Sequence, residues 1–173
     1  MKSDSIMNDV VDYYSENGNA NERMEATYLL GCVYRDMGDT PLAIKYYQDA
    51  INHADILNKD CDFYTLSRIC GQMGGIFEEQ DSYNIMLPYF KLASKYAFIA
   101  KDTLGALSYY KDKGMAYYFM GKYDSVFITS KNVSNLYLRY GYKDLAFQPS
   151  DIEIYIYLLK KQFAKAKHCM DIS

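Results

Sequence analysis

Several residue types that build specialised sites are scarce in this 173-residue sequence, which has no tryptophan, three prolines and two histidines. The scarcity of proline favours uninterrupted helices, because proline removes a backbone donor and breaks a helix interior. The histidines, His53 and His168, form no HxxxH or HExxH pair, and this argues against a zinc site. We therefore expect neither a metal ion nor another cofactor.

Cysteine is also sparse, and the four copies are scattered without a CxxC pair: Cys32, Cys61, Cys70 and Cys169. This usage favours a reducing compartment. Cys169 follows His168, but adjacent side chains on a helix point about 100° apart, so the two do not readily act together as a nucleophile and its general base. The GQMGG segment at 71–75 lacks the Lys-Ser/Thr ending of a phosphate-binding loop. We expect no enzymatic activity.

Long apolar runs are missing as well. No segment approaches the roughly 18 apolar residues of a membrane span, and the N-terminus lacks the apolar run of a secretory signal. The net charge of -3 is too small to indicate a nucleic-acid or membrane surface. We expect a soluble, cytoplasmic protein, unless a signal, an anchor or further domains lie outside this sequence. Four lysines near one end fit a solvated helix face, with a phosphate or partner patch as the alternative: Lys160, Lys161, Lys165 and Lys167.

Tyrosine is abundant, with 20 copies, and half of all residues are apolar, which is ample for a continuous core. In residues 26–50 the small and large side chains fall at the spacings of two antiparallel helices packed as a hairpin. Gly-Asp-Thr-Pro at 38–41 supplies the turn between them. The small residues are Gly31, Ala43 and Ala50, and the large ones are Leu30, Tyr34 and Tyr47.

The same pattern recurs along the chain, with glycines at positions 31, 74 and 114. The second copy carries Phe77, Phe90 and Ala93 at the positions of Tyr34, Tyr47 and Ala50, with Met86 at the position of Ala43. The third carries Tyr117, and its second helix presents Val126, Ser130 and Val133, a weaker match. A fourth unit, opened by a capping box at residues 150–153, aligns Ile154, Tyr157, Phe163 and Ala166.

This arrangement of Leu30, Gly31 and Tyr34 followed by Ala43, Tyr47 and Ala50 resembles the tetratricopeptide repeat family. The spacing of about 40 residues exceeds the family's usual 34 or so and is similar to that of bacterial regulatory members, which implies longer helices. The resemblance implies an all-α fold, a right-handed superhelix (α-α solenoid) in a single domain over residues 1–173. A leading cap helix is expected at 5–16, with repeats near 24–57, 67–100 and 107–140 and a partial one near 147–173.

In this family the first helix of each repeat lines a concave, partner-binding groove. Carried over to this chain, the resemblance implies a groove formed by Tyr28, Cys32, Arg35, Arg68, Gln72, Gly75, Ser108, Lys111, Asp112, Met115, Tyr118 and Tyr155. The arginines suit main-chain carbonyls or a carboxylate, while the methionine and tyrosines offer apolar contact. Tyr28 and Cys32 occupy places where chaperone-binding members carry a carboxylate clamp, so binding by that clamp is not expected. Gly71 and Gly75 fit either local helix bending or the close approach of a ligand.

The resemblance therefore implies a non-enzymatic scaffold for a protein or an extended peptide. The alternative is a peptide- or ligand-sensing module of a larger signalling or transcription-regulating protein. Phe163, Ala166 and Met170 form an apolar set at helical spacing near residue 173, with no polar capping helix after it. We expect this surface to be covered by a second copy in a homodimer, or by further repeats or an output domain.

Overall fold

The computed structural model describes residues 2–147 and 150–172, and the side chains of residues 5–147 and 151–171. Helices account for most of this part of the chain, and it contains no strand. They are α1 (Lys2–Asn17), α2 (Ala20–Asp36), α3 (Thr40–His53), α4 (Phe63–Glu79), α5 (Tyr83–Ile99), α6 (Thr103–Phe119), α7 (Tyr123–Arg139), α8 (Ser150–Leu159) and α9 (Phe163–Ile172), with a 3-10 turn, η1 (Lys143–Leu145), between α7 and α8.

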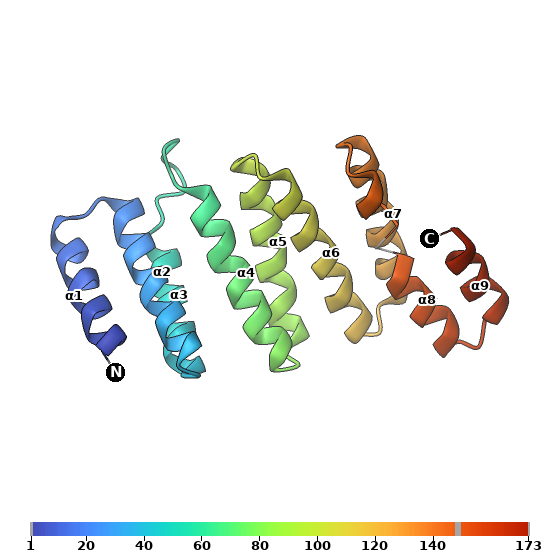
Figure 1. The fold of residues 1–173 in the computed structure, drawn as a ribbon, viewed down its shortest axis with the longest axis horizontal. Helices are drawn as coiled ribbons and strands as arrows, with labels where there is room; N and C mark the ends of the chain where they lie inside the picture. The colour runs from blue at the N-terminus through green and yellow to red at the C-terminus, as the bar shows by residue number, and fades with distance from the viewer. Residues whose placement is uncertain (1, 148–149, 173) are drawn as a thin grey trace.

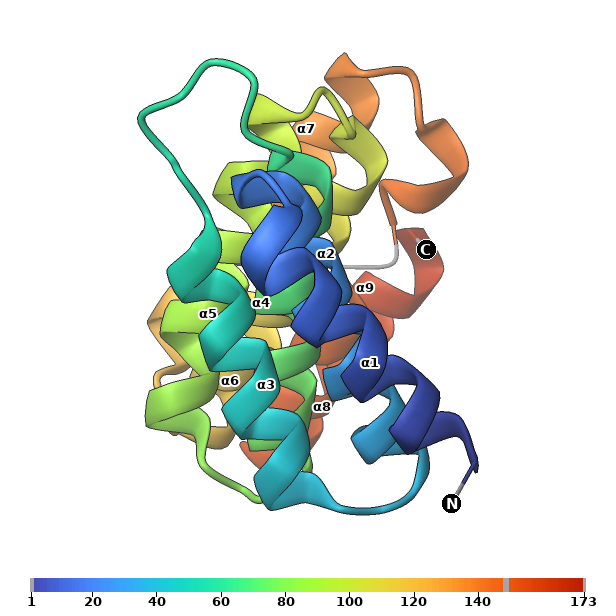
Figure 2. The same cartoon turned by 90° about the vertical axis from the view of Figure 1, so that its left-hand side faces the viewer.

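The helices follow one another along the long axis of the molecule, with the two termini near opposite ends (Figure 1). Almost all packing joins helices adjacent in sequence, which gives the hairpins α2–α3, α4–α5, α6–α7 and α8–α9. Helix α1 packs on α2, at the position expected for the leading helix, and Figure 2 shows it at the front of the end-on view. The prediction of an all-α chain of successively packed helices is confirmed.

The first helix of each of the first three hairpins begins with a side chain that caps it. Asn19 accepts a hydrogen bond from the Glu22 backbone N–H at 3.1 Å, and the Glu22 carboxylate accepts one from the Asn19 N–H at 2.8 Å. Asp62 and Asp102 cap α4 and α6 by accepting hydrogen bonds from the Thr65 and Gly105 N–H groups, without a reciprocal bond. These caps start the helices at Ala20, Phe63 and Thr103, about one turn before the repeat boundaries expected from the sequence. Ser150 is the first residue of α8, but the side chain required by its predicted capping box is outside the described ones.

The turn predicted between the two helices of the first hairpin, α2 and α3, is confirmed. Gly38 has a φ of +79°, a conformation that glycine adopts without a steric penalty. The Asp39 carboxylate then accepts a hydrogen bond from the Leu42 N–H at 3.1 Å, and Pro41 lies in the first turn of α3. The chain therefore reverses direction over a few residues, and α2 and α3 pack side by side.

Aromatic rings fill the first two hairpins. A Cβ placed on Gly31 would lie 2.6 Å from Cδ1 of Tyr47, and one on Gly74 would lie 2.8 Å from Cε1 of Phe90. The missing side chains of these glycines are therefore what allows each ring to lie against the facing helix. Both rings are buried, Tyr47 completely and Phe90 almost so.

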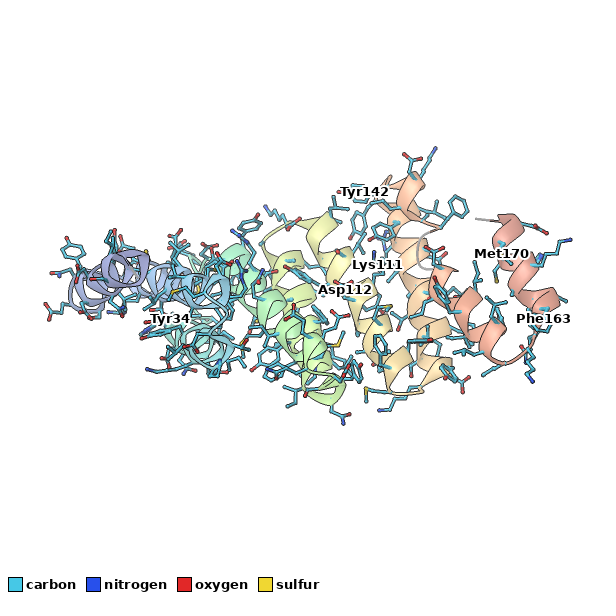
Figure 3. The ribbon with its side chains drawn as sticks, turned by 60° about the horizontal axis from the view of Figure 1, so that its bottom comes forward. Tyr34, Lys111, Asp112, Tyr142, Phe163 and Met170 are labelled. Carbon is cyan, nitrogen blue, oxygen red and sulfur yellow. The ribbon has the colours of Figure 1, made fainter. Side chains whose placement is uncertain are left out.

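Packing is weaker toward the C-terminal end. Helices α8 and α9 have 10 residues each, and the α7–α8 junction is the loosest between consecutive helices. Ala166 is buried, so this member of the predicted exposed apolar set is covered by the chain itself. Phe163 and Met170 are 64% and 52% exposed, at the end of the molecule opposite Tyr34 (Figure 3).

Candidate functional site

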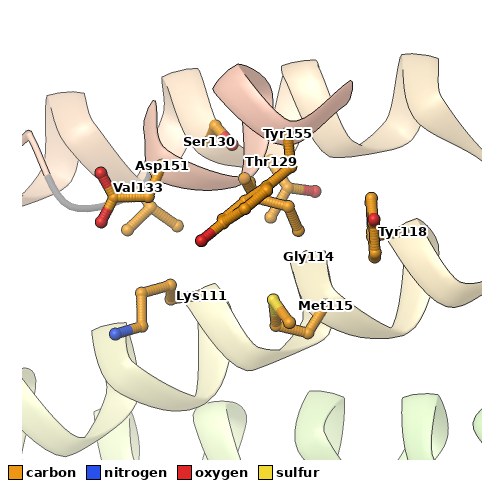
Figure 4. Close-up of a pocket in the computed structure, with 10 residues that line it drawn as sticks. Lys111, Gly114, Met115, Tyr118, Thr129, Ser130, Val133, Asp151 and Tyr155 are labelled. Atoms are coloured by element: carbon orange, nitrogen blue, oxygen red, sulfur yellow. The ribbon is translucent and has the colours of Figure 1, made fainter. Parts of the chain in front are cut away.

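A cavity of about 490 Å³ lies between α6, α7 and α8 (Figure 4). We refer to it as the joint pocket, because it occupies the junction between the third and fourth hairpins. Its lining comes from all three helices: Lys111, Gly114, Met115 and Tyr118 of α6, Thr129, Ser130 and Val133 of α7, and Asp151, Ile152 and Tyr155 of α8.

The joint pocket lies where the earlier hairpins hold an aromatic ring. Ser130 follows Gly114 by the same number of residues as Tyr47 follows Gly31 and Phe90 follows Gly74. A Cβ on Gly114 would meet only Thr129, with Cγ2 at 3.4 Å, and no ring. The space that a ring fills in the first two hairpins is therefore left open in the third.

A second ring is missing at the preceding position. In the first hairpin Tyr46 stacks on Tyr34, with ring centroids 5.2 Å apart. In the second, the equivalent Tyr89 stacks on Phe77 at 5.6 Å. The third hairpin has Thr129 at this place, so two hydroxyl side chains replace two rings on adjacent positions of α7.

The contact across the junction also changes from apolar to polar. Between the first two hairpins, Tyr47 and Met73 belong to one buried cluster. The equivalent residues at the α7–α8 junction are the polar Ser130 and Glu153, whose side chains interact. Burial raises the pKa of Glu153, and the hydrogen bond from Ser130 partly opposes that rise.

The lining has a charged end and an apolar end. Figure 4 shows the Lys111 amine and the Asp151 carboxylate toward one end of the pocket, with Met115 and Tyr118 toward the other. Tyr155 projects from α8 over the opening and is 62% exposed. An occupant with an apolar body and a polar or charged portion would therefore match this lining.

Four residues of the predicted groove line this pocket together: Lys111, Met115, Tyr118 and Tyr155. The other eight do not. Tyr28 is only 3% exposed, and its ring lies 5.7 Å from that of Tyr47 within the core. It is therefore a core residue, because α2 turns this position toward α3, and the prediction that places it in the groove is wrong.

The predicted groove residues of the first two hairpins form a separate polar group. The Arg35 guanidinium donates to the Gln72 side-chain oxygen at 2.6 Å and pairs with Asp36 at 2.7 Å. Arg68 is exposed, and its guanidinium lies over the Tyr64 ring at 5.9 Å. The half-buried Cys32 accepts a hydrogen bond from the Tyr47 hydroxyl at 3.5 Å.

Gly71 and Gly75, the two further glycines of α4, have different surroundings. A Cβ on Gly71 would lie 2.5 Å from Cε1 of Tyr109, so this glycine allows a ring of α6 to pack on α4. Apart from the neighbouring turns of α4 itself, no atom lies within 4 Å of a Cβ built on Gly75, which therefore leaves open space on α4. The remaining two residues of the predicted groove, Ser108 and Asp112, lie on α6, and both are half-buried. Burial raises the pKa of Asp112 to about 6.

The sequence did not reveal the contributions of α7 and of the start of α8 to the pocket. Ser130 stood out only as a weak match to the repeat pattern. The signal that would have identified the pocket is the loss of the aromatic residue at both positions, Thr129 and Ser130, opposite a retained Gly114.

Other kinds of site have little support. Burial raises the pKa of the Cys70 thiol to about 12, so its reactive thiolate is not populated at neutral pH. Within residues 2–147 and 150–172, no group of three or more histidine, cysteine, aspartate or glutamate side chains is placed to hold a metal ion. None of the helices described is both long and apolar enough to cross a bilayer.

No protein-family model matches the sequence, and a search of curated proteins also found no match. The likeness to tetratricopeptide repeats therefore rests on the motif in the sequence, and the pocket must be interpreted from its own geometry.

Proposed function

We propose that this protein is a tetratricopeptide-like binding module without enzymatic activity, which binds an extended segment of a partner protein. The joint pocket would be its main point of contact. One observation carries the proposal: four residues assigned to a partner-binding groove from sequence, Lys111, Met115 and Tyr118 on α6 and Tyr155 on α8, line one cavity of the size and composition of a ligand pocket.

The properties of the lining support a peptide as the occupant. Met115 and Tyr118 offer adaptable apolar contact, since methionine is flexible and tyrosine combines an apolar ring with a polar tip. Lys111 and Asp151 at the charged end could pair with groups on the partner that carry the opposite charge, or hydrogen-bond its main chain. The pocket opens to solvent, so a partner chain can continue beyond it.

The polar group on the first two hairpins would extend this contact. Arg35 and Arg68 are both exposed, and guanidinium groups bind carbonyls and carboxylates in fixed geometry. The ion pair of Arg35 with the exposed Asp36 contributes little free energy, because solvent screens it, so a carboxylate of the partner can compete for the arginine.

The proposal can be tested by selecting peptides from a random display library against the full chain and measuring their affinity. Met115→Glu places a carboxylate at the apolar end of the pocket, and we expect it to weaken binding by about tenfold or more. The matched control is Ile128→Glu, which makes the same charge change at a position of α7 that is 63% exposed. Equal affinity of the Met115→Glu variant and the parent would refute the pocket as the binding site.

A second variant pair tests the polar group. Arg35→Ala and Arg68→Ala should each weaken binding of the selected peptides while leaving the free energy of unfolding nearly unchanged, because neither side chain is buried. Lys91→Ala, an exposed position on α5, removes a positive charge elsewhere and serves as the control. If all three variants bind equally well, the partner does not extend over the first two hairpins.

A sensing module remains a second candidate, because the pocket lies at the loosest junction of consecutive helices. An occupant in contact with both α7 and α8 would favour one placement of the last hairpin over others. Such a displacement could be passed to an output domain, and a change in the α7–α8 distance on peptide binding, measured between two spin labels, would support this candidate.

A further inference from the structure

The internal repeats of the chain show what fits in the joint pocket. Tyr47 and Phe90 lie over Gly31 and Gly74 respectively, with ring atoms less than 3 Å from where a Cβ would be. Gly114 keeps the same glycine at the same place, but the α7 residue that would supply the ring is Ser130. The glycine that accepts a ring is therefore present in the third hairpin, and the ring is not.

We propose that the joint pocket binds an aromatic side chain of the partner, phenylalanine or tyrosine, over Gly114, at the place equivalent to that of Tyr47 and Phe90. This inference rests on the proposed function and specifies its ligand. The partner would complete the third hairpin with a ring that the chain itself supplies in the first and second.

The lining favours a ring over an aliphatic side chain. The Tyr47 hydroxyl reaches the sulfur of Cys32, and the residue equivalent to Cys32 in the third hairpin is Met115, which lines the pocket. A thioether sulfur packs favourably against the edge of an aromatic ring. Tyr155 on α8 adds a second ring at the opening, where an aromatic occupant can stack on it.

No aromatic side chain of the third hairpin occupies the space itself. Tyr118 is the nearest candidate, but its ring packs against Phe119 and Tyr123, with centroid distances of 5.3 and 6.2 Å. On α8, Tyr157 packs against Phe127 at 5.2 Å, and neither of them is among the residues that line the pocket. These contacts keep the rings of Tyr118 and Tyr157 engaged elsewhere, whereas Tyr155 lies at the opening.

The first measurement uses two small probes, N-acetyl-phenylalaninamide and N-acetyl-leucinamide, and the NMR signal of the Met115 methyl group. We expect the phenylalanine probe to shift this signal in a saturable way and the leucine probe to bind at least several-fold more weakly. Equal affinity of the two probes, or no saturable shift with phenylalanine, would overturn the proposal of an aromatic anchor.

The second measurement restores the ring within the chain. The double variant Ser130→Phe with Glu153→Leu copies the apolar pairing of Tyr47 and Met73. The second substitution removes the Glu153 carboxylate, which would otherwise lose the Ser130 hydroxyl as its partner. We expect this double variant to lose binding of the phenylalanine probe and to unfold at a temperature higher by about 4 °C or more. Ile128→Phe, which adds a ring at an exposed position of α7, should change neither property.

A double variant that folds and still binds the probe would overturn the proposal. If the double variant fails to fold, Ser130→Leu fills the pocket partly, and retention of full probe affinity by this variant would overturn it as well. The peptides selected from a library separate this inference from the proposed function. Peptides that bind through the pocket without a fixed aromatic residue would refute only the aromatic anchor, whereas the absence of any binding peptide would refute the module itself.

Discussion

The first and third hairpins have the same plan but differ in what lies between their helices. Both have a packing glycine on the first helix, and both have a tight turn with a glycine at positive φ, Gly38 in one and Gly121 in the other. The first hairpin is filled by Tyr47, whereas the third has Ser130 at that place and a cavity beside it. The comparison teaches that a repeat can keep its packing glycine and its turn while losing its central side chain. The departure from the pattern then marks the candidate site.

The two hairpins also differ in the free energy that their cores contribute. Burying an aromatic side chain completely contributes about 2–3 kcal/mol. The third hairpin forgoes this contribution and has instead a polar contact between Ser130 and Glu153. A ligand that brings its own ring would restore the missing burial, which links the stability of this region to its occupancy.

The largest effect is expected when the first hairpin is made to resemble the third. Tyr47→Ser removes a completely buried ring, and we expect it to lower the free energy of unfolding by about 3 kcal/mol or more. Urea denaturation followed by circular dichroism measures this loss. A loss below about 1 kcal/mol would mean that the ring is not what holds α2 and α3 together.

Alanine substitutions of the two packing glycines, Gly31 and Gly114, should have smaller effects on stability, and these effects should differ. Gly31→Ala places a Cβ 2.6 Å from the buried Tyr47 ring, and we expect it to cost about 2 kcal/mol. Gly114→Ala meets its nearest atom at 3.4 Å, and the gain of up to about 1 kcal/mol from alanine in a helix should leave it neutral or more stable. Thermal unfolding of both variants tests the comparison directly, and equal losses would contradict it.

The third prediction concerns Asp112 on α6, whose folded-state pKa of about 6 lies above the ordinary value of 3.8 because of burial. Lys111 lowers this pKa and Glu78 raises it, and the carboxylate in turn raises the pKa of Tyr109 and Tyr137. The folded state favours the protonated carboxyl, so its contribution to stability is complete below pH 3.8 and is lost as the pH rises to about 6.

Asp112→Asn should therefore have little effect near pH 4 and stabilise the chain near pH 7, by at most about 1 kcal/mol because solvent screens this half-buried group. Denaturation at the two pH values measures the difference. A variant that is less stable than the parent at pH 7 would show that the carboxylate makes a favourable contact in its charged form.

The smallest effect on stability is expected at the C-terminal end, where Phe163 and Met170 are more than half exposed. We expect this surface to pair weakly with a second copy of the chain. Phe163→Lys should abolish that pairing in light scattering at high concentration, with a change in the free energy of unfolding within about 0.5 kcal/mol. A parent chain that stays monomeric at every concentration would refute the pairing.

The sequence predicted the hairpins well because their determinants are local. The spacing of Gly31, Tyr34 and Tyr47, and the glycine and proline of the turn, depend on helix geometry alone. The predicted repeats begin about one turn after the helices do, because the repeat pattern does not include the capping residues Asn19 and Asp62.

The candidate site was predicted only in part. Lys111 and Met115 could be placed because they lie on one face of one helix, and such a face follows from periodicity. The cavity itself depends on three helices and on whether any neighbouring side chain fills the space at Ser130, which no local pattern records. Tyr28 was misplaced for a related reason, since the groove position of one repeat becomes a core position when the facing helix carries Tyr47.

The loose junction between α7 and α8 has a consequence for hydrogen exchange. Because nearly all packing joins consecutive helices, the last hairpin can open without disturbing α2–α5. Its amide protons should therefore exchange earliest among the four hairpins. An occupant of the joint pocket would bridge α7 and α8, and it should slow exchange most in α8 and α9, including amides of α9 that it does not touch. Local opening would then govern how fast the occupant leaves, so that its residence time follows the stability of the last hairpin.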